Sequence, residues 1–334
     1  MKTIKSLPEL FTLIFATFAC YLFIETQVDI SGIASLGDLS SIDLIVLSFL
    51  CSVLIAVIAV IAGVGGGVIF TPILLAFTSI DTLIIRSTGL VVAMFSGLVS
   101  TGPLMRKGLA DVKLVFLGAL PIIVGGMLGS IAAISLAKHL GETSDGIVRL
   151  MLGLLLVFIA MLFIFSGKNM EYPTARPADN LAMKLKLRHS YWEDSLNSTI
   201  SYKAIHIKMA IFLFLVVGFT GGFFGLGGGW AVVPVLNLIM SIPLKVATAS
   251  SGVLLALGNA AAIWPYINAG ALIGVVAAPW MLGQVVGGII GAHILASVKA
   301  SIVRNILITM LLASSLKLIG RGIETLSGID IPVL

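Results

Sequence analysis

The sequence predicts an all-α polytopic membrane protein built from two repeats of inverted topology. Three observations predict this class: a very apolar composition, long stretches without charged residues, and a glycine-rich motif that occurs twice. Of the 334 residues, 59% are hydrophobic and 10% are charged. A soluble surface carries roughly 25–35% charged residues, and disordered chains have low hydrophobicity. A soluble domain and a disordered chain are therefore both excluded.

The membrane-spanning helices are predicted from stretches that lack Asp, Glu, Lys and Arg. A helical span needs about 20 mostly apolar residues, and several of these stretches, such as 44–80, 209–244 and 246–298, are longer than that. They predict helices at about residues 44–62, 83–102, 112–137, 147–166, 207–224, 245–264, 271–296 and 300–319.

One extra helix is predicted at the N-terminus, where Phe11 to Ile24 form another apolar run. The first five residues resemble the basic start of a signal peptide, but no clean cleavage site follows. We expect an uncleaved anchor, with cleavage as the alternative.

Two stretches, 44–80 and 207–242, are too long for one span and short for two full ones. Both are interrupted by glycines, which favour breaks and turns in a helical pattern. Each is predicted to be a helical hairpin, in which one helix ends at a glycine-rich break and a shorter helix returns. Each repeat then consists of this hairpin and three further helices.

The internal repeat is defined by two copies of one motif. Gly63-Val64-Gly65-Gly66-Gly67 with Pro72 matches Gly225-Leu226-Gly227-Gly228-Gly229 with Pro234, a shift of 162 residues (225 − 63). The same shift relates Pro103 to Pro265, Gly108 to Gly270, Gly125-Gly126 to Gly287-Gly288, and Gly129 to Gly291. A constant register over so many positions indicates duplication.

Basic residues predict the sidedness, because they collect in cytoplasmic loops. The linker between the repeats is basic and is placed inside, together with the Arg106-Lys107 loop and the N-terminus. Counting crossings onward places 265–270, the uncharged counterpart of the Arg106-Lys107 loop, outside. The two repeats are therefore predicted to be inverted, an architecture that secondary transporters use for alternating access.

These arguments divide the chain into five parts. They are residues 1–43 for the anchor helix and an acidic periplasmic segment, 44–167 for the first repeat, 168–206 for a basic cytoplasmic linker, 207–320 for the second repeat and 321–334 for a C-terminal tail.

The glycine breaks are the first candidate binding elements. Irregular backbone inside a bilayer persists only where protein or a water-filled cavity satisfies it. A helix that restarts after a break directs unpaired N–H groups and a positive dipole end at its surroundings. Two inverted breaks could therefore hold an anion at the membrane midplane. The alternative is close helix packing through small residues, which we expect for Gly125-Gly126 and Gly129.

Neutral polar side chains near the breaks are the second group of candidates. Hydroxyls and amides can donate to anionic oxygens without bringing a buried charge, and their alternative roles are bonds within or between helices. Arg86 is included because it could attract an anion from the outer mouth, or instead snorkel at the interface. The predicted substrate-binding residues are Gly65, Gly66, Gly67, Arg86, Ser87, Thr88, Gly227, Gly228, Gly229, Asn237, Ser250, Ser251, Asn259 and Gln284.

Missing residue types exclude other functions. No Asp or Glu lies deep in a predicted span, which disfavours a cation or metal transporter. No carboxylate pair, HExxH motif or P-loop is present, so no enzyme activity, catalytic residue, metal or cofactor is predicted. His293, the one histidine inside a long span, is a candidate for proton coupling or for packing. Nucleic acid binding is not expected, because no basic patch is interleaved with aromatics.

The doubled elements GVGGGVIFTP and GLGGGWAVVP, each followed by a Ser/Thr-Gly helix start, resemble the TauE/SafE family of sulfite and sulfonate exporters. The resemblance covers about residues 44–318 and includes the glycines and prolines of both motifs. It implies secondary transport of sulfite, thiosulfate or organosulfonates across the bacterial cytoplasmic (inner) membrane.

The function predicted from these residues is therefore secondary transport of a sulfur-containing anion, with a passive anion channel as the alternative and an intramembrane enzyme disfavoured. The expected partners are the small anion, membrane lipid and protons as a candidate coupling ion. Substrate identity, transport direction, coupling and oligomeric state stay open.

Overall fold

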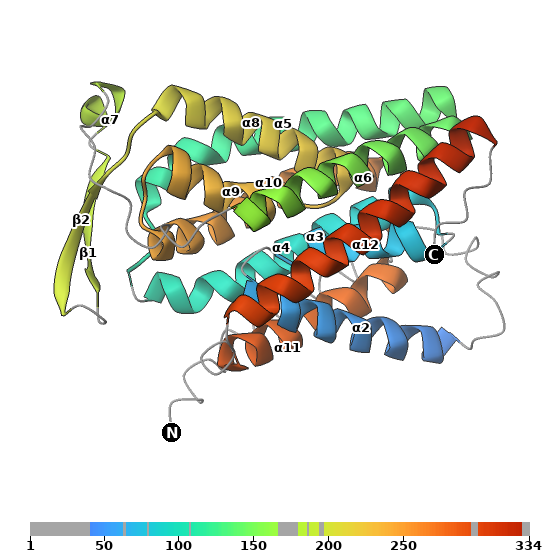
Figure 1. Ribbon diagram of the computed structural model, residues 1–334, viewed down its shortest axis with the longest axis horizontal. Helices are drawn as coiled ribbons and strands as arrows, with labels where there is room; N and C mark the ends of the chain where they lie inside the picture. The colour runs from blue at the N-terminus through green and yellow to red at the C-terminus, as the bar shows by residue number, and fades with distance from the viewer. Residues whose placement is uncertain are drawn as a thin grey trace.

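A computed structural model describes residues 41–62, 65–78, 80–106, 108–165, 180–185, 187–193, 197–294 and 300–328. This part of the chain is almost entirely helical, as predicted (Figure 1). The predicted N-terminal helix, Gly63, Val64, Lys107, most of the first half of the linker, the side chain of His293 and the end of the C-terminal tail lie outside the described residues.

The helices follow the predicted order closely. Their bounds are α2 Ser41–Ala62, α3 Gly67–Phe77, α4 Thr82–Arg106, α5 Val112–Leu140, α6 Glu142–Phe165, α7 Asn180–Lys184, α8 Ile207–Phe224, α9 Gly229–Pro234, α10 Leu244–Asn268, α11 Gly274–Ile294 and α12 Ala300–Ser327. Helix α12 ends at Ser327, beyond the predicted end of this helix at about residue 319.

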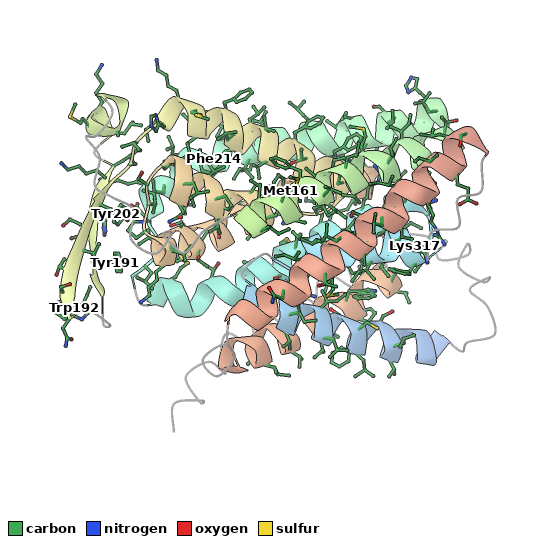
Figure 2. All side chains as sticks on the ribbon, viewed as in Figure 1. Met161, Tyr191, Trp192, Tyr202, Phe214 and Lys317 are labelled. Atoms are coloured by element: carbon green, nitrogen blue, oxygen red, sulfur yellow. The ribbon has the colours of Figure 1, made fainter. Side chains whose placement is uncertain are left out.

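The outer surface of the bundle is apolar. Large side chains such as Leu54, Phe116 and Leu120 are 65–77% exposed on helices that pack only on one face, and Figure 2 shows side chains projecting outward all along the bundle. Among the described residues, six helices (α4, α5, α6, α8, α10 and α11) are long and apolar enough to cross a membrane. Because exposed apolar surface of this extent is not tolerated in water, the fold is that of a multi-pass membrane protein.

Both predicted hairpins are present. Helix α2 is followed by a break and α3, and α8 by a break and α9. Gly65, Gly225 and Gly227 have φ angles of +82°, +70° and +66°, a left-handed conformation that glycine adopts without a steric penalty. These glycines therefore permit the left-handed backbone in the described part of each break, between the end of one helix and the start of the next.

The second hairpin has an additional irregularity. Helix α9 continues from Pro234 into a π-helical segment, Val235–Ile239. Proline has no N–H for the helical ladder, and single π turns relieve such interruptions. Asn237 lies in this segment and its Nδ2 donates to the Ile242 carbonyl at 2.8 Å, which closes the turn into α10.

The two repeats are interlocked rather than side by side. The largest helix contacts join α2 to α11, α8 to α5, α6 to α12 and α4 to α10, so each pair takes one helix from each repeat. The glycine contacts obey the shift of 162 residues. Gly125 packs on the Leu215 carbonyl, and Gly287 on that of Val53. The next glycines repeat the pattern: Gly129 packs on Phe219, and Gly291 on Val57. The predicted packing role of Gly125 and Gly129 is confirmed.

Helices α4 and α10 pack against each other in opposite directions. Gly97 lies beside Gly252, and Gly252 in turn approaches Thr101. Near the start of α4, the Ser87 Oγ donates to the carbonyl of Ala271, just beyond the end of α10. The starts of α4 and α10 therefore lie at opposite ends of the bundle.

The loop contacts agree with the predicted grouping of the loops by side. At one end, Thr82 Oγ1 donates to Asp145 at 2.8 Å, and the Arg321 side chain donates to the Thr78 carbonyl. At the other end, the Asp111 N–H donates to Ser250 Oγ at 3.0 Å, and Tyr202 of the linker donates to the Asp111 carboxylate at 2.9 Å. Which end faces the cytoplasm stays a prediction.

The linker contains an antiparallel β-hairpin that the sequence analysis missed. Strand β1, Arg188–Glu193, pairs with β2, Ser198–Lys203, and the hairpin lies beyond one end of the bundle (Figure 1). It is attached through Tyr202 to Asp111, whose carboxylate also accepts the N–H groups of Lys113 and Leu114 as the N-cap of α5. The hairpin is thus fixed to the α4–α5 turn.

We expect Tyr202→Phe to release this hairpin. A hydrogen bond to a charged group contributes about 1.5–3 kcal/mol, so the detached population should rise at least about tenfold. Limited proteolysis at residues 187–203 measures it, with the exposed Ser201→Ala on the same strand as the control. Equal cleavage rates in the two variants would contradict the assignment.

The same contact predicts an alkaline limit. Burial raises the pKa of Tyr202 above its ordinary value of 10.0, and the Asp111 carboxylate raises it further. Because the folded state favours the protonated phenol, the stabilisation is fully present below pH 10 and is lost as the pH rises above it. In Tyr202→Phe this part of the pH dependence should disappear.

Candidate functional site

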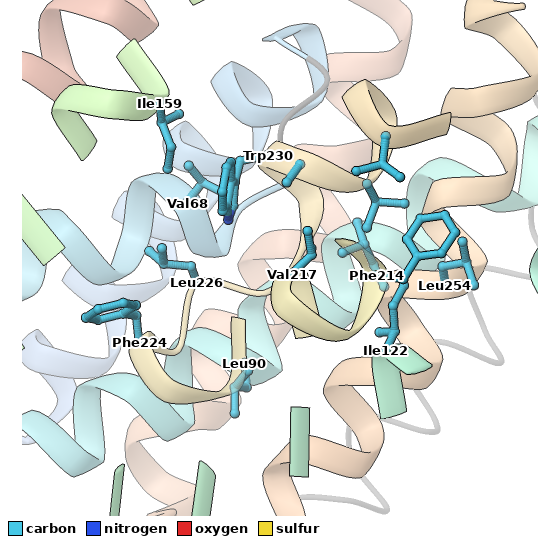
Figure 3. Close-up of a cluster of buried hydrophobic side chains, with 14 of the residues drawn as sticks. Val68, Leu90, Ile122, Ile159, Phe214, Val217, Phe224, Leu226, Trp230 and Leu254 are labelled. Carbon is cyan, nitrogen blue, oxygen red and sulfur yellow. The ribbon is translucent and has the colours of Figure 1, made fainter. Parts of the chain in front are cut away.

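The two glycine breaks meet inside the bundle. A Cβ placed on Gly65 would lie 4.0 Å from the Gly229 Cα, and one on Gly67 would collide with the Leu226 carbonyl. At Gly67 backbone packs against backbone, and only glycine permits this closeness. The structure therefore brings the predicted residues Gly65, Gly67 and Gly229 together. Figure 3 shows Leu226, Val68 and Trp230 in the apolar cluster around the breaks.

Helix α4 packs against both breaks with a face of small residues. A Cβ on Gly67 would lie 2.8 Å from the Ala93 Cβ, and one on Gly227 would lie 2.6 Å from it. One turn further along, Ser96 Oγ accepts the N–H of Gly66 at 3.0 Å. The sequence analysis did not select Ser96, although Gly89, Ala93, Ser96 and Gly97 mark one helical face of small residues.

Two buried amides flank the breaks. Gln284 of α11 is fully buried, and its Oε1 lies where a Cβ on Gly66 would collide with it. Asn259 of α10 is 4% exposed, and its Nδ2 would lie 2.9 Å from a Cβ on Gly227. Both were predicted site residues, and each lies against the break of one hairpin.

A small cavity adjoins the second break. Its volume is about 10 Å³, room for about one water molecule. Six glycines contribute to its wall, together with the side chains of Ile122, Leu255, Asn259 and Ala262; the glycines are Gly126, Gly218, Gly221, Gly222, Gly228 and Gly258.

Several buried polar atoms at the breaks have no hydrogen-bond partner within the described part of the chain. They are Asn259 Nδ2, Gln284 Oε1 and Trp230 Nε1; elsewhere in the described residues Thr88 Oγ1 and Arg149 Nε are in the same position. An unsatisfied buried polar group costs about 1–3 kcal/mol, so such groups are rare in natural proteins and call for an explanation. Asn259, Gln284 and Thr88 are predicted site residues. Trp230 was missed, although it directly follows the second glycine motif.

The predicted serine pairs do not converge. Ser87 Oγ donates to the carbonyls of Ile84 and Ala271, and Ser250 Oγ accepts the Asp111 N–H at the opposite end. Ser251 Oγ donates to the Thr248 carbonyl within its own helix. Their contribution to a substrate site stays a prediction, and the hydrogen bonds that they make in the structure join parts of the protein to each other.

Arg86 was predicted either to attract an anion at the outer mouth or to snorkel at the membrane interface. It is fully buried in the structure, and its part in binding stays a prediction. Its guanidinium donates to the Phe223 carbonyl at 3.2 Å and to the backbone and hydroxyl of Thr82, and Tyr266 Oη donates to the Gly222 carbonyl beside it. A cation at this position stabilises the C-terminal end of α8, where the last backbone carbonyls have no donor within the helix.

An apolar multi-pass bundle with paired glycine breaks and buried neutral donors defines the class of membrane transporters. The chain belongs to the TauE/SafE family: the family model described as sulfite exporter TauE/SafE matches residues 48–318. Transporters of this family are not enzymes, which agrees with the absence of catalytic motifs.

A curated relative gives the same class. The chain is 30% identical over 196 residues to the probable membrane transporter protein YunE of Bacillus subtilis (strain 168). This match covers 57% of the chain and 66% of the relative's own length. No solved structure matches the chain.

Proposed function

We propose that this protein is a secondary transporter that moves sulfur-containing anions, such as sulfite, thiosulfate or organosulfonates, across the cytoplasmic membrane. The substrate is held where the two glycine breaks meet, between Asn259 and Gln284. The observation that carries the proposal is this pairing of breaks with buried, unpartnered polar groups and without a nearby acid. Neutral donors and helix N-termini stabilise an anion without a buried cation. The family description, sulfite exporter, supports the substrate class.

Alternating access is the proposed mechanism. The shift of 162 residues takes α2 to α8 and α5 to α11, so the packed pair α5–α8 is the repeat equivalent of the packed pair α11–α2. Helices α4 and α10 are equivalent to each other under the same shift, and they pack together antiparallel. A twofold axis perpendicular to these helices relates such pairs, which supports repeats of inverted topology. A cavity of about 10 Å³ is too small for a sulfur oxyanion, so the halves must move for the substrate to enter.

Several further features belong to the same proposal. The N-terminus and the linker face the cytoplasm, consistent with their basic residues. Protons are the candidate coupling ion, and the absence of deep carboxylates leaves the substrate itself as one carrier of the proton. A passive channel is the alternative, and closely packed breaks disfavour a permanently open pore.

The test is transport by the purified protein in liposomes. Labelled sulfite or a sulfonate should show saturable uptake and counterflow, whereas a channel gives current steps and no counterflow. The absence of flux for every such anion would refute the proposal.

Asn259→Ala should raise the KM for the transported anion at least about tenfold, because a hydrogen bond to a charged group contributes about 1.5–3 kcal/mol. Ser315→Ala is the matched control, since Ser315 is fully buried in α12 and its hydroxyl donates to the Leu312 carbonyl within its own helix. Unchanged KM in Asn259→Ala would remove this residue from the site.

A further inference from the structure

The orientation of the Gln284 side-chain amide is fixed by its partners. One end of the amide lies 3.3 Å from the Ser52 carbonyl and 3.2 Å from Ser52 Oγ. A carbonyl only accepts hydrogen bonds. The Ser52 hydroxyl gives its proton to the Trp280 carbonyl at 2.6 Å, so towards Gln284 it accepts as well. Both contacts therefore require the amide nitrogen, and Oε1 must face the other way.

The oxygen of Gln284 consequently faces the first glycine break. It lies against Gly66, whose own N–H donates to Ser96 Oγ. Within the part of the chain that the structure describes, Oε1 has no hydrogen-bond partner, and Gln284 is fully buried. An acceptor held in this place disfavours a ligand that presents only anionic oxygens, because two acceptors repel each other.

The other unpartnered groups at the breaks include donors. Trp230 Nε1 is a donor only, and no rotation of the ring changes this. Asn259 Nδ2, against the second break, is a second donor. The unpartnered groups at the two breaks are thus two donors, Trp230 Nε1 and Asn259 Nδ2, and one acceptor, Gln284 Oε1. A ligand that satisfies all three needs anionic oxygens for the donors and one hydrogen-bond donor for Gln284 Oε1.

Resting on the proposed function, we infer that the substrate is a sulfur-containing monoanion that carries one hydrogen-bond donor and gives it to Gln284 Oε1. The donor can be the hydroxyl of hydrogen sulfite or the hydroxyl of an organosulfonate. Anions without such a hydrogen, including thiosulfate and simple alkanesulfonates, are bound more weakly. Ser52 is the positioning residue that holds the amide in this orientation.

The inference is tested by competition in proteoliposomes that counterflow labelled sulfite. Isethionate (2-hydroxyethanesulfonate) and 1-propanesulfonate form a matched pair, because both are permanent monoanions of similar size and only the first carries a hydroxyl. Sulfite uptake over a pH series forms the second arm. The variants are Gln284→Met, which keeps the volume and removes the acceptor, and the remote Ser315→Ala.

Two results support the inference. Either isethionate competes at least about tenfold better than 1-propanesulfonate, or sulfite uptake follows the protonated fraction while neither sulfonate competes. The first places the donor on an organosulfonate and the second on hydrogen sulfite. In both cases Gln284→Met must reduce the preference at least about threefold while Ser315→Ala keeps it.

Two other results overturn it. Equal competition by the two sulfonates together with uptake independent of protonation, or a preference that survives in Gln284→Met, rejects the donor but leaves the proposed transport intact. The absence of counterflow with any sulfur anion rejects the proposed function, and the inference with it.

Discussion

Gly225→Ala is expected to leave no stably folded protein. Gly225 ends α8 with φ +70°, and a Cβ there would collide with the backbone of Arg86. The left-handed conformation alone costs about 1–2 kcal/mol for a residue with a side chain. The collision adds more, because neither backbone can move without displacing a buried helix. Size-exclusion chromatography and thermal unfolding in detergent measure the outcome.

The control for this variant is Gly270→Ala. Gly270 has φ +69°, but no atom lies within 4 Å of a Cβ placed on it. It should therefore lose only the conformational contribution and remain folded. If the two variants were equally stable, the close packing of the second break on α4 would be wrong.

Arg86→Met is expected to lower the free energy of unfolding by about 3 kcal/mol. The variant removes the Arg86 donor from the Phe223 carbonyl at the end of α8, which keeps only the longer contact from Tyr266 Oη at 3.4 Å. A buried acceptor that is poorly satisfied costs up to about 1–3 kcal/mol. The variant also removes a cation from the negative end of the helix dipole, where a favourable, partly buried charge contributes up to about 2 kcal/mol. The midpoint of thermal unfolding should fall accordingly.

Arg86→Met also separates two roles for this side chain. A structural cap predicts lower stability with an unchanged KM in the folded fraction, whereas an anion-attracting group predicts the reverse. Arg321→Met is the matched control, because Arg321 bonds the Thr78 carbonyl at the bundle end and is only partly buried. A rise in KM without a loss of stability would support the predicted binding role of Arg86.

The fold was largely predictable because glycine, proline and charge act locally. The breaks at Gly65 and Gly227 could be predicted because glycine favours breaks and turns in a helical pattern. The grouping of the loops at the two ends of the bundle could be predicted from the distribution of charge. The β-hairpin was missed because its strands are short and lie in a basic segment that composition alone describes as a linker.

The candidate site was predictable only in part. The amides Asn259 and Gln284 stand out as polar residues in charge-free spans, and they do lie at the breaks. Ser87 and Ser250 stand out equally, but the antiparallel packing of α4 and α10 separates them, and no local signal reports that. Ser96 and Trp230 join the candidate site only through tertiary contacts, which a single sequence does not contain.

The interlocked repeats have a consequence for biosynthesis. Val53 of α2 packs against Gly287 of α11. This face of α2 is therefore translated early but can be covered only after most of the polypeptide has been translated. The Ser52 hydroxyl likewise finds the Trp280 carbonyl only then. Neither half on its own completes its packing, whereas two halves expressed as separate polypeptides should assemble in one cell.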